Sequence, residues 1–119
     1  MATFPENSEF NPVDPNAMIS LFGVEDKTLF SKLMNSFVEK TEGDIQGLCT
    51  ALTSNEPQTV VEIAHKIKSA ARSIGANDLA ALCEFLEQQG KSEGLERPQD
   101  MAVELGTRFE QVSQFVAAY

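Results

Sequence analysis

The chain has 119 residues, of which 42% are hydrophobic and 23% are charged, and its formal net charge at pH 7 is −9. This length suits one compact domain with a core and is too short for two ordinary domains. The acidic balance argues against a nucleic-acid partner, which requires a broad basic surface. No apolar run is long enough to span a bilayer and no leader pattern opens the sequence, so we expect no membrane partner and a cytoplasmic location.

The start of the chain is expected to be an irregular arm. Residues 1–13 show no sustained hydrophobic period, and we assign residues 14–119 to a single helical domain. Asp14 followed by Pro15 is typical of a helix start, and Gly23 can end a helix in a left-handed conformation. A short helix is therefore predicted between these signals.

Two longer helices are predicted next. The first opens near Glu25, and its apolar residues recur at steps of three and four as far as Leu52. The following helix has Asn55 as a candidate cap and Pro57 in its first turn, where a missing backbone amide costs nothing. Gly75 is expected to end it.

The remaining chain supplies two more amphipathic helices. One starts near Asn77 after a very short link, residues 90–97 are predicted to form a loop, and the last helix begins at Pro98. No segment shows the two-residue alternation of a half-buried strand. The pattern predicts an all-α fold, an antiparallel up-down-up-down four-helix bundle with the short N-terminal helix capping one end.

The only histidine, His65, is placed on an exposed helix face by the hydrophobic pattern. At 100° per residue it lies opposite the apolar stripe of its helix. That stripe consists of Val60, Ile63, Ile67, Ala70 and Ile74. The segment from His65 to Arg72 carries three cations and no acid, in a chain of net charge −9, which favours an anion at the ring. Position alone favours a surface histidine without a role.

A family resemblance rests on this segment and the helix after it. The sequence reads Ala-His-Lys-Ile-Lys-Ser from Ala64, continues to Ile-Gly-Ala, and is followed by Leu79, Leu82-Cys83, Leu86-Glu87 and Gly90. From about Val24 to the C-terminus the chain thereby resembles a histidine-containing phosphotransfer (HPt) domain. The resemblance implies that His65 is the phosphoryl acceptor, that Lys68 stabilises the phosphoryl charge, and that Gly75 is the glycine before the next helix.

The resemblance also implies a function and its partners. We expect a stand-alone phosphoryl carrier with no kinase activity of its own, which accepts a phosphoryl group on His65 from a receiver-domain aspartate and passes it to another receiver in a two-component phosphorelay. The implied partners are response-regulator receiver domains and a hybrid histidine kinase. No cofactor or metal is expected on this chain, since the divalent cation belongs to the receiver. A monomer is expected, because different partners must reach the site in turn.

Other polar residues near His65 are candidates for supporting roles at the site. Glu62, one turn earlier, could orient the ring by a hydrogen bond, although we favour the interpretation of a solvated helix residue. Lys68 is predicted to lie on the exposed face, with Arg72 either reinforcing it from farther away or serving solubility. The resembled family often has glycine directly after that lysine, where this chain has the small residue Ser69.

Docking of a receiver requires apolar surface near the ring. Val61 lies beside His65 and off the buried stripe, so it is a candidate docking contact, as are Leu29 and Phe22 if the bundle leaves them near that face.

Two other functions stay open. The main alternative is a non-catalytic helical binding module that docks on a receiver or kinase and modulates it without carrying phosphate, and Ser69 at the approach surface leaves room for it. The other is a purely structural bundle. An enzyme is disfavoured, because the sequence offers no second histidine for a metal, no glycine-rich phosphate loop and no nucleophile paired with a base.

Overall fold

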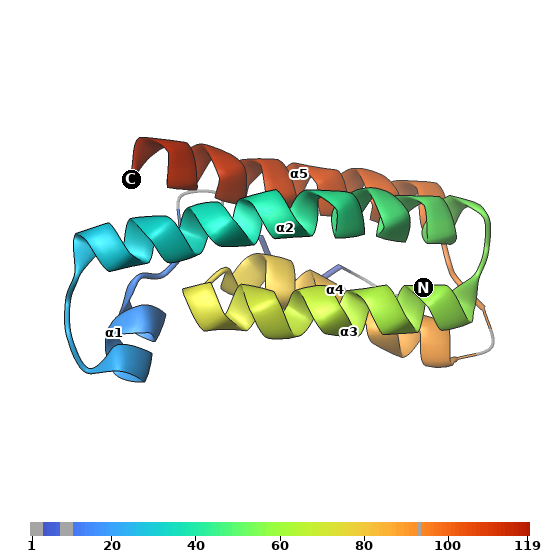
Figure 1. The fold of residues 1–119 in the computed structure, drawn as a ribbon. Coiled ribbons are helices and arrows are strands. Elements are labelled where there is room, and N and C mark those ends of the chain that lie inside the picture. Colours follow the sequence, from blue (N-terminus) through green and yellow to red (C-terminus); the bar gives the residue numbers. More distant parts are fainter. Residues whose placement is uncertain (1–3, 8–10, 93) are drawn as a thin grey trace.

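The computed structural model describes residues 4–7, 11–92 and 94–119, and all regular structure in these ranges is helical. Its helices are α1 (Asn16–Phe22), α2 (Lys27–Thr53), α3 (Pro57–Ile74), α4 (Asn77–Lys91) and α5 (Pro98–Ala118). The four long helices form a bundle in which α2 packs on α3 and α5, and α4 packs on the same two helices. Figure 1 shows α2 and α5 side by side above the pair α3 and α4. The predicted all-α bundle is confirmed.

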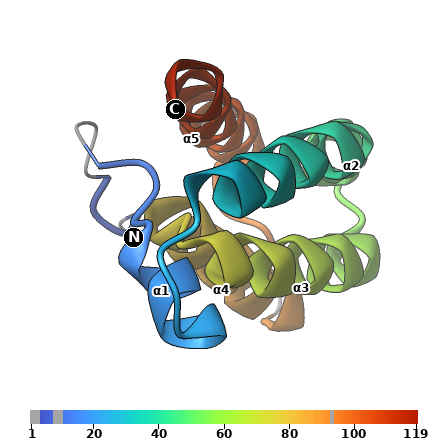
Figure 2. The same cartoon turned by 60° about the vertical axis from the view of Figure 1, so that its left-hand side comes forward.

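The short helix α1 lies at one end of the bundle. It contacts α3, and Figure 2 shows it beside the start of α2 and the end of α3. The Asp14 carboxylate accepts a hydrogen bond from the backbone N–H of Asn16 at 3.0 Å. Gly23 ends α1 with φ 74°, and its N–H donates to the Ile19 carbonyl at 2.8 Å. Both predicted end signals of this helix are therefore used.

The other helix starts follow local sequence with one exception. Asp26 caps α2, since its carboxylate accepts from the N–H of Leu29 at 3.0 Å. Pro57 and Pro98 lie in the first turns of α3 and α5. The expectation that Asn55 caps α3 is wrong, because this residue takes a left-handed conformation with φ 54° in the preceding turn.

The predicted loop at residues 90–97 is shorter than expected at its start. The helix α4 continues through Gly90 to Lys91. Gly90 is needed there because α3 approaches closely: a Cβ at this position would lie 2.7 Å from the Pro57 carbonyl oxygen and 2.7 Å from Cγ2 of Val61. The pair α3 and α4 is thus packed nearly backbone to backbone at this end.

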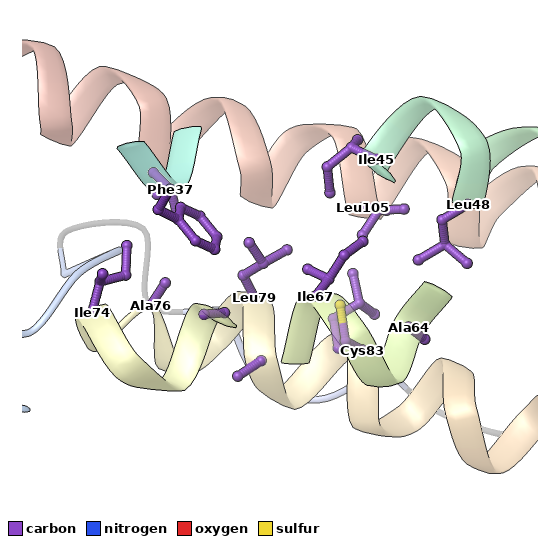
Figure 3. Packing of buried hydrophobic residues seen from close by; sticks show 14 of the residues in the cluster. Phe37, Ile45, Leu48, Ala64, Ile67, Ile74, Ala76, Leu79, Cys83 and Leu105 are labelled. Carbon is purple, nitrogen blue, oxygen red and sulfur yellow. The ribbon is translucent and has the colours of Figure 1, made fainter. Parts of the chain in front are cut away.

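The core lies between the two layers (Figure 3). Fully buried side chains come from each of the four long helices. They include Phe30, Met34, Leu48 and Leu52 from α2, Ile67 from α3, Leu79, Leu82 and Leu86 from α4, and Leu105 from α5. Removal of these apolar surfaces from water is the main term that holds the helices together.

One charged side chain, Arg108 of α5, also lies in the core and is 2% exposed. Its Nε donates to the Glu104 carboxylate at 2.9 Å, and Nη1 donates to the Asp78 carbonyl at 2.8 Å. Nη2 donates to the carbonyl of Pro5 in the N-terminal arm. A buried guanidinium is tolerated when its donors are paired in this way. Arg108 therefore ties α5 to the first turn of α4 and to the arm.

The turn between α3 and α4 is fixed by Gly75. This residue has φ 80°, a conformation that favours glycine. The N–H of Asp14 donates to the Gly75 carbonyl at 2.8 Å, and a Cβ at residue 75 would overlap the carbonyl of Asp14. The close approach holds the start of α1 against this turn. The left-handed conformation of Gly75 reverses the chain so that α4 packs on α3, and this pairing builds the site described next.

Candidate functional site

His65 lies in the middle of α3, and its side chain is 62% exposed. The buried face of α3 is turned further towards α4 than the hydrophobic pattern predicts, since Ala64, Lys68 and Ala71 are buried whereas Ile63 and Ala70 of the predicted stripe are half-buried. A rigid helix therefore presents the imidazole to solvent, and a partner can reach it without any opening of the core.

The inner nitrogen of this ring is held by Glu87, a residue to which the sequence pattern assigned no role. Nδ1 of His65 lies 3.2 Å from Oε2 of Glu87, a residue of α4 whose side chain is 6% exposed. An ionised carboxylate can only accept, so Nδ1 is the donor. In the neutral ring, Nε2 then carries the free lone pair. Among the described residues no hydrogen bond to Nε2 is present, and this nitrogen is free to react.

Two lysines keep Glu87 ionised. Nζ of Lys68 lies 2.7 Å from Oε1, and Nζ of Lys91 lies 3.2 Å from Oε2. The hydrogen bond from Lys68, with a further one from Lys91, lowers the pKa of Glu87 from 4.5 to about 2, against the opposing effect of burial. The carboxylate therefore stays an acceptor for His65 throughout the neutral pH range.

Lys68 is not on the exposed face, and the prediction that it would be is wrong. Its side chain is 11% exposed, because α4 covers that side of α3. Its ammonium lies 2.7 Å from Glu84 and 2.7 Å from Glu87, and hydrogen bonds to these two carboxylates raise its pKa. The charge is thus engaged within the protein. Direct stabilisation of a phosphoryl group by Lys68 stays a prediction.

The other predicted neighbours of His65 make no hydrogen bond to its ring in the part of the chain that the structure describes. Glu62 is exposed, and the carboxylate that binds Nδ1 comes from Glu87 instead. The hydroxyl of Ser69 donates to the backbone carbonyl of His65 at 3.2 Å. Ser69 therefore places only one small side chain beside the path of a partner to the ring. Arg72 is exposed in the last turn of α3, where a cation also suits the helix dipole.

The predicted docking residues fall into two places. Val61 is half-buried and faces Gly90 of α4, so it is less exposed than expected. Leu29 is half-buried against the core, whereas Phe22 is 44% exposed and packs near Phe30 with ring centroids 6.5 Å apart. Of the three, Phe22 offers the most accessible apolar surface.

Phe22 belongs to an apolar groove of about 220 Å³ between α1, α2 and α3. Its walls are Leu21, Phe22, Leu33, Phe37, Ala70 and Ile74, with Ser36, Lys40, Thr41 and Ser73 completing the lining. Leu21 is 62% exposed at its mouth. The residues Ala70 and Ser73 place the groove one to two turns beyond His65 on α3. The apolar pair before Gly23 was the sequence feature that could have indicated it.

The arrangement presents one reactive side chain to solvent. It offers one exposed ring nitrogen backed by an ionised carboxylate, and no cluster of three metal-ligating side chains occurs in the part of the chain that the structure describes. Within the same residues, no helix is both long and apolar enough to cross a membrane. A bundle that presents such a histidine on one helix defines the class of histidine phosphotransfer domains.

Comparisons with known proteins agree. The model of the Hpt domain family matches residues 32–115, and the chain belongs to this family. The crystal structure of histidine-containing phosphotransfer protein B (HptB) from Pseudomonas aeruginosa PAO1 is similar, with a TM-score of 0.76 and 25% sequence identity over 92% of this chain and 97% of that one. No curated protein sequence matches. The family assigns the chain a histidine phosphotransfer role in phosphorelays, and Hpt domains interact with receiver domains.

Proposed function

We propose that His65 carries the phosphoryl group on Nε2 and moves it between the aspartates of two receiver domains. One observation supports this most strongly. The ring is 62% exposed while its Nδ1 is held by the nearly buried carboxylate of Glu87, so the nitrogen left free is the one that points away from the backbone.

The transfer requires no proton to leave the ring. The Nε2 lone pair attacks phosphorus in line, the bond between phosphorus and the aspartyl oxygen breaks, and the electron pair returns to the receiver carboxylate. The ring then carries a positive charge with its Nδ1 proton still donated to Glu87. The reverse sequence passes the group to a second receiver. The divalent cation that neutralises the equatorial oxygens is supplied by the receiver.

Glu87 contributes to both directions. Its negative charge lies 3.2 Å from the nitrogen that shares the new positive charge, and burial limits screening by water. Stabilisation of the phosphorylated ring makes acceptance favourable. Because the proton stays on Nδ1, the ring remains a good leaving group for the next transfer.

The receiver is proposed to dock on the groove between α1, α2 and α3. Apolar side chains at Leu21 and Phe22 would be covered, as expected for the core of an interface. Lys40 in the groove lining adds positive charge to this part of an acidic protein, which favours a partner that carries acidic groups around its apolar contact. A receiver of a hybrid histidine kinase is the donor we expect, and a monomer leaves the face open to successive partners.

The test is transfer of labelled phosphate from a phosphorylated receiver. We expect acid-labile, alkali-stable label on the wild type and none on His65→Gln, with both proteins equally helical by circular dichroism. Label that a second receiver then removes would complete the relay. Binding of a receiver without any label on His65 would favour the alternative, a module that docks and modulates without carrying phosphate.

A further inference from the structure

The ammonium of Lys68 is held between two carboxylates on the inner side of the site. It has three N–H donors, and two of them are used at 2.7 Å, by Oε2 of Glu84 and by Oε1 of Glu87. Distances this short are typical of charge-assisted hydrogen bonds, which are stronger than neutral ones. Only 11% of the side chain is exposed, so water offers little competition.

Lys68 and His65 bind opposite oxygens of one carboxylate. Oε1 of Glu87 accepts from Lys68, and Oε2 accepts from Nδ1 of His65 at 3.2 Å. The hydrogen bond from Lys68 to Oε1 restrains the orientation of the Glu87 carboxylate. That orientation sets the position of Oε2, the oxygen that faces His65. The network runs from Glu84 through Lys68 and Glu87 to the ring, and it ends at Nδ1, the nitrogen that does not react.

We propose that Lys68 is a positioning residue that acts on His65 through Glu87, and that it does not bind the phosphoryl group. The proposal rests on the proposed role of His65 as the carrier. Lys68 holds Glu87 ionised and in the orientation that keeps the proton on Nδ1, and Nε2 therefore keeps its lone pair.

Movement of Lys68 outward to the phosphoryl oxygens would be unfavourable. The ammonium would have to lengthen the two 2.7 Å contacts that hold it between Glu84 and Glu87, and the side chain of Glu87 is only 6% exposed. A buried carboxylate that loses its cation is strongly destabilised. Lys91 is a poor substitute at that oxygen, because its own contact is to Oε2 at 3.2 Å and its side chain is 54% exposed.

The first test needs no phosphate. Nitrogen-15 NMR of labelled histidine reports which ring nitrogen carries the proton at a pH where the ring is neutral. We expect the Nδ1 proton in the wild type and a mixed population in Lys68→Met. The control is Lys66→Met, which removes a neighbouring charge from α3. Because Lys66 pairs with Asp44 at 3.2 Å, the tautomer of His65 in this variant should match that of the wild type. An unchanged tautomer in folded Lys68→Met would overturn the proposal.

The second test is a double-mutant cycle on the transfer rate. Lys68→Met is expected to slow transfer to His65 about tenfold in the wild-type background and by less than about twofold in Glu87→Ala, because its effect passes through Glu87. The same tenfold loss in both backgrounds would mean that the ammonium contacts the phosphoryl group, and would overturn the proposal.

A third variant covers the case in which Lys68→Met does not fold. Glu84→Gln changes a side chain that is 42% exposed and leaves Lys68 with one strong partner instead of two. The lifetime of the phosphohistidine is expected to stay within about twofold of the wild type. A clearly longer lifetime would show that the freed ammonium reaches the phosphoryl oxygens. Absence of any label on wild-type His65 would refute the proposed function, whereas the tautomer measurement would still decide the role of Lys68.

Discussion

Nδ1 of His65 and Oε2 of Glu87 lie 3.2 Å apart although 22 positions separate the two residues in the sequence. The contact joins the exposed face of α3 to the buried side of α4. It determines which ring nitrogen faces a partner, and the chemistry of the site depends on it.

Removal of this carboxylate should impair transfer in a specific way. In Glu87→Ala we expect transfer to His65 to slow about 10- to 100-fold, as when orienting carboxylates of metal-bound histidines are removed. The fraction of His65 phosphorylated at equilibrium with a phosphorylated receiver should also fall, because the positive ring loses its counter-charge. Quench-flow measurements of the label check both. Glu62→Gln, on the exposed face of α3, is the matched control and should behave as wild type. Equal effects of the two substitutions would contradict this role for Glu87.

The stability of the fold should depend on Glu87 in acid. Its pKa is lowered from 4.5 to about 2, mainly by the hydrogen bond from Lys68, so its ionised form adds stability above the unfolded pKa. That contribution is lost as the pH falls from about 5 towards 2. In Glu87→Gln the free energy of unfolding, measured by urea titration, should therefore change less over this range than in the wild type. Glu42→Gln, exposed on α2, should leave the slope as it is, and a slope unchanged in Glu87→Gln would refute the prediction.

Close packing of α3 on α4 should be sensitive to Gly90. In Gly90→Ala the new Cβ would lie 2.7 Å from the Pro57 carbonyl oxygen, which belongs to the backbone and cannot turn aside. We expect a loss of about 1–3 kcal/mol in the free energy of unfolding. The control is Gly106→Ala in α5, where a Cβ meets nothing within 4 Å and the helix should gain up to about 1 kcal/mol. If urea titrations gave Gly90→Ala a higher free energy of unfolding than Gly106→Ala, this would show that α3 and α4 can move apart at Gly90 without loss of stability.

Receiver binding should depend on the groove between α1, α2 and α3. Leu21 is 62% exposed, so Leu21→Asp should leave the fold intact while it weakens binding of a receiver about tenfold or more by titration calorimetry. Val103 of α5 is 70% exposed outside this groove, and Val103→Asp is the matched control. Equal affinities of the two variants would place the receiver on another face.

The helices were largely predictable because their ends and faces are written in local sequence. Asp26, Pro57, Gly75 and Pro98 act within one turn of the helix ends that they define. Asn55 was misassigned because asparagine serves both as a cap and in the left-handed turn that it adopts here. Local patterns do not separate these two uses.

The site was predictable only in part, because it is built from two helices. The pattern of α3 placed His65 outward, but it could not show that α4 covers the side that carries Lys68. Glu87 follows Cys83 by four residues and so lies on the buried face of α4. A carboxylate at a core position requires a cationic or hydrogen-bond-donating partner, so this position in the pattern indicates that Glu87 pairs with a residue of a neighbouring helix.

The most direct test of the account is the atom to which phosphorus is bound. After transfer from a phosphorylated receiver to protein labelled with nitrogen-15 in its single histidine, we expect phosphorus–nitrogen coupling in the NMR spectrum to Nε2 of His65. Coupling to Nδ1, or stable label with no coupling to the ring, would contradict it.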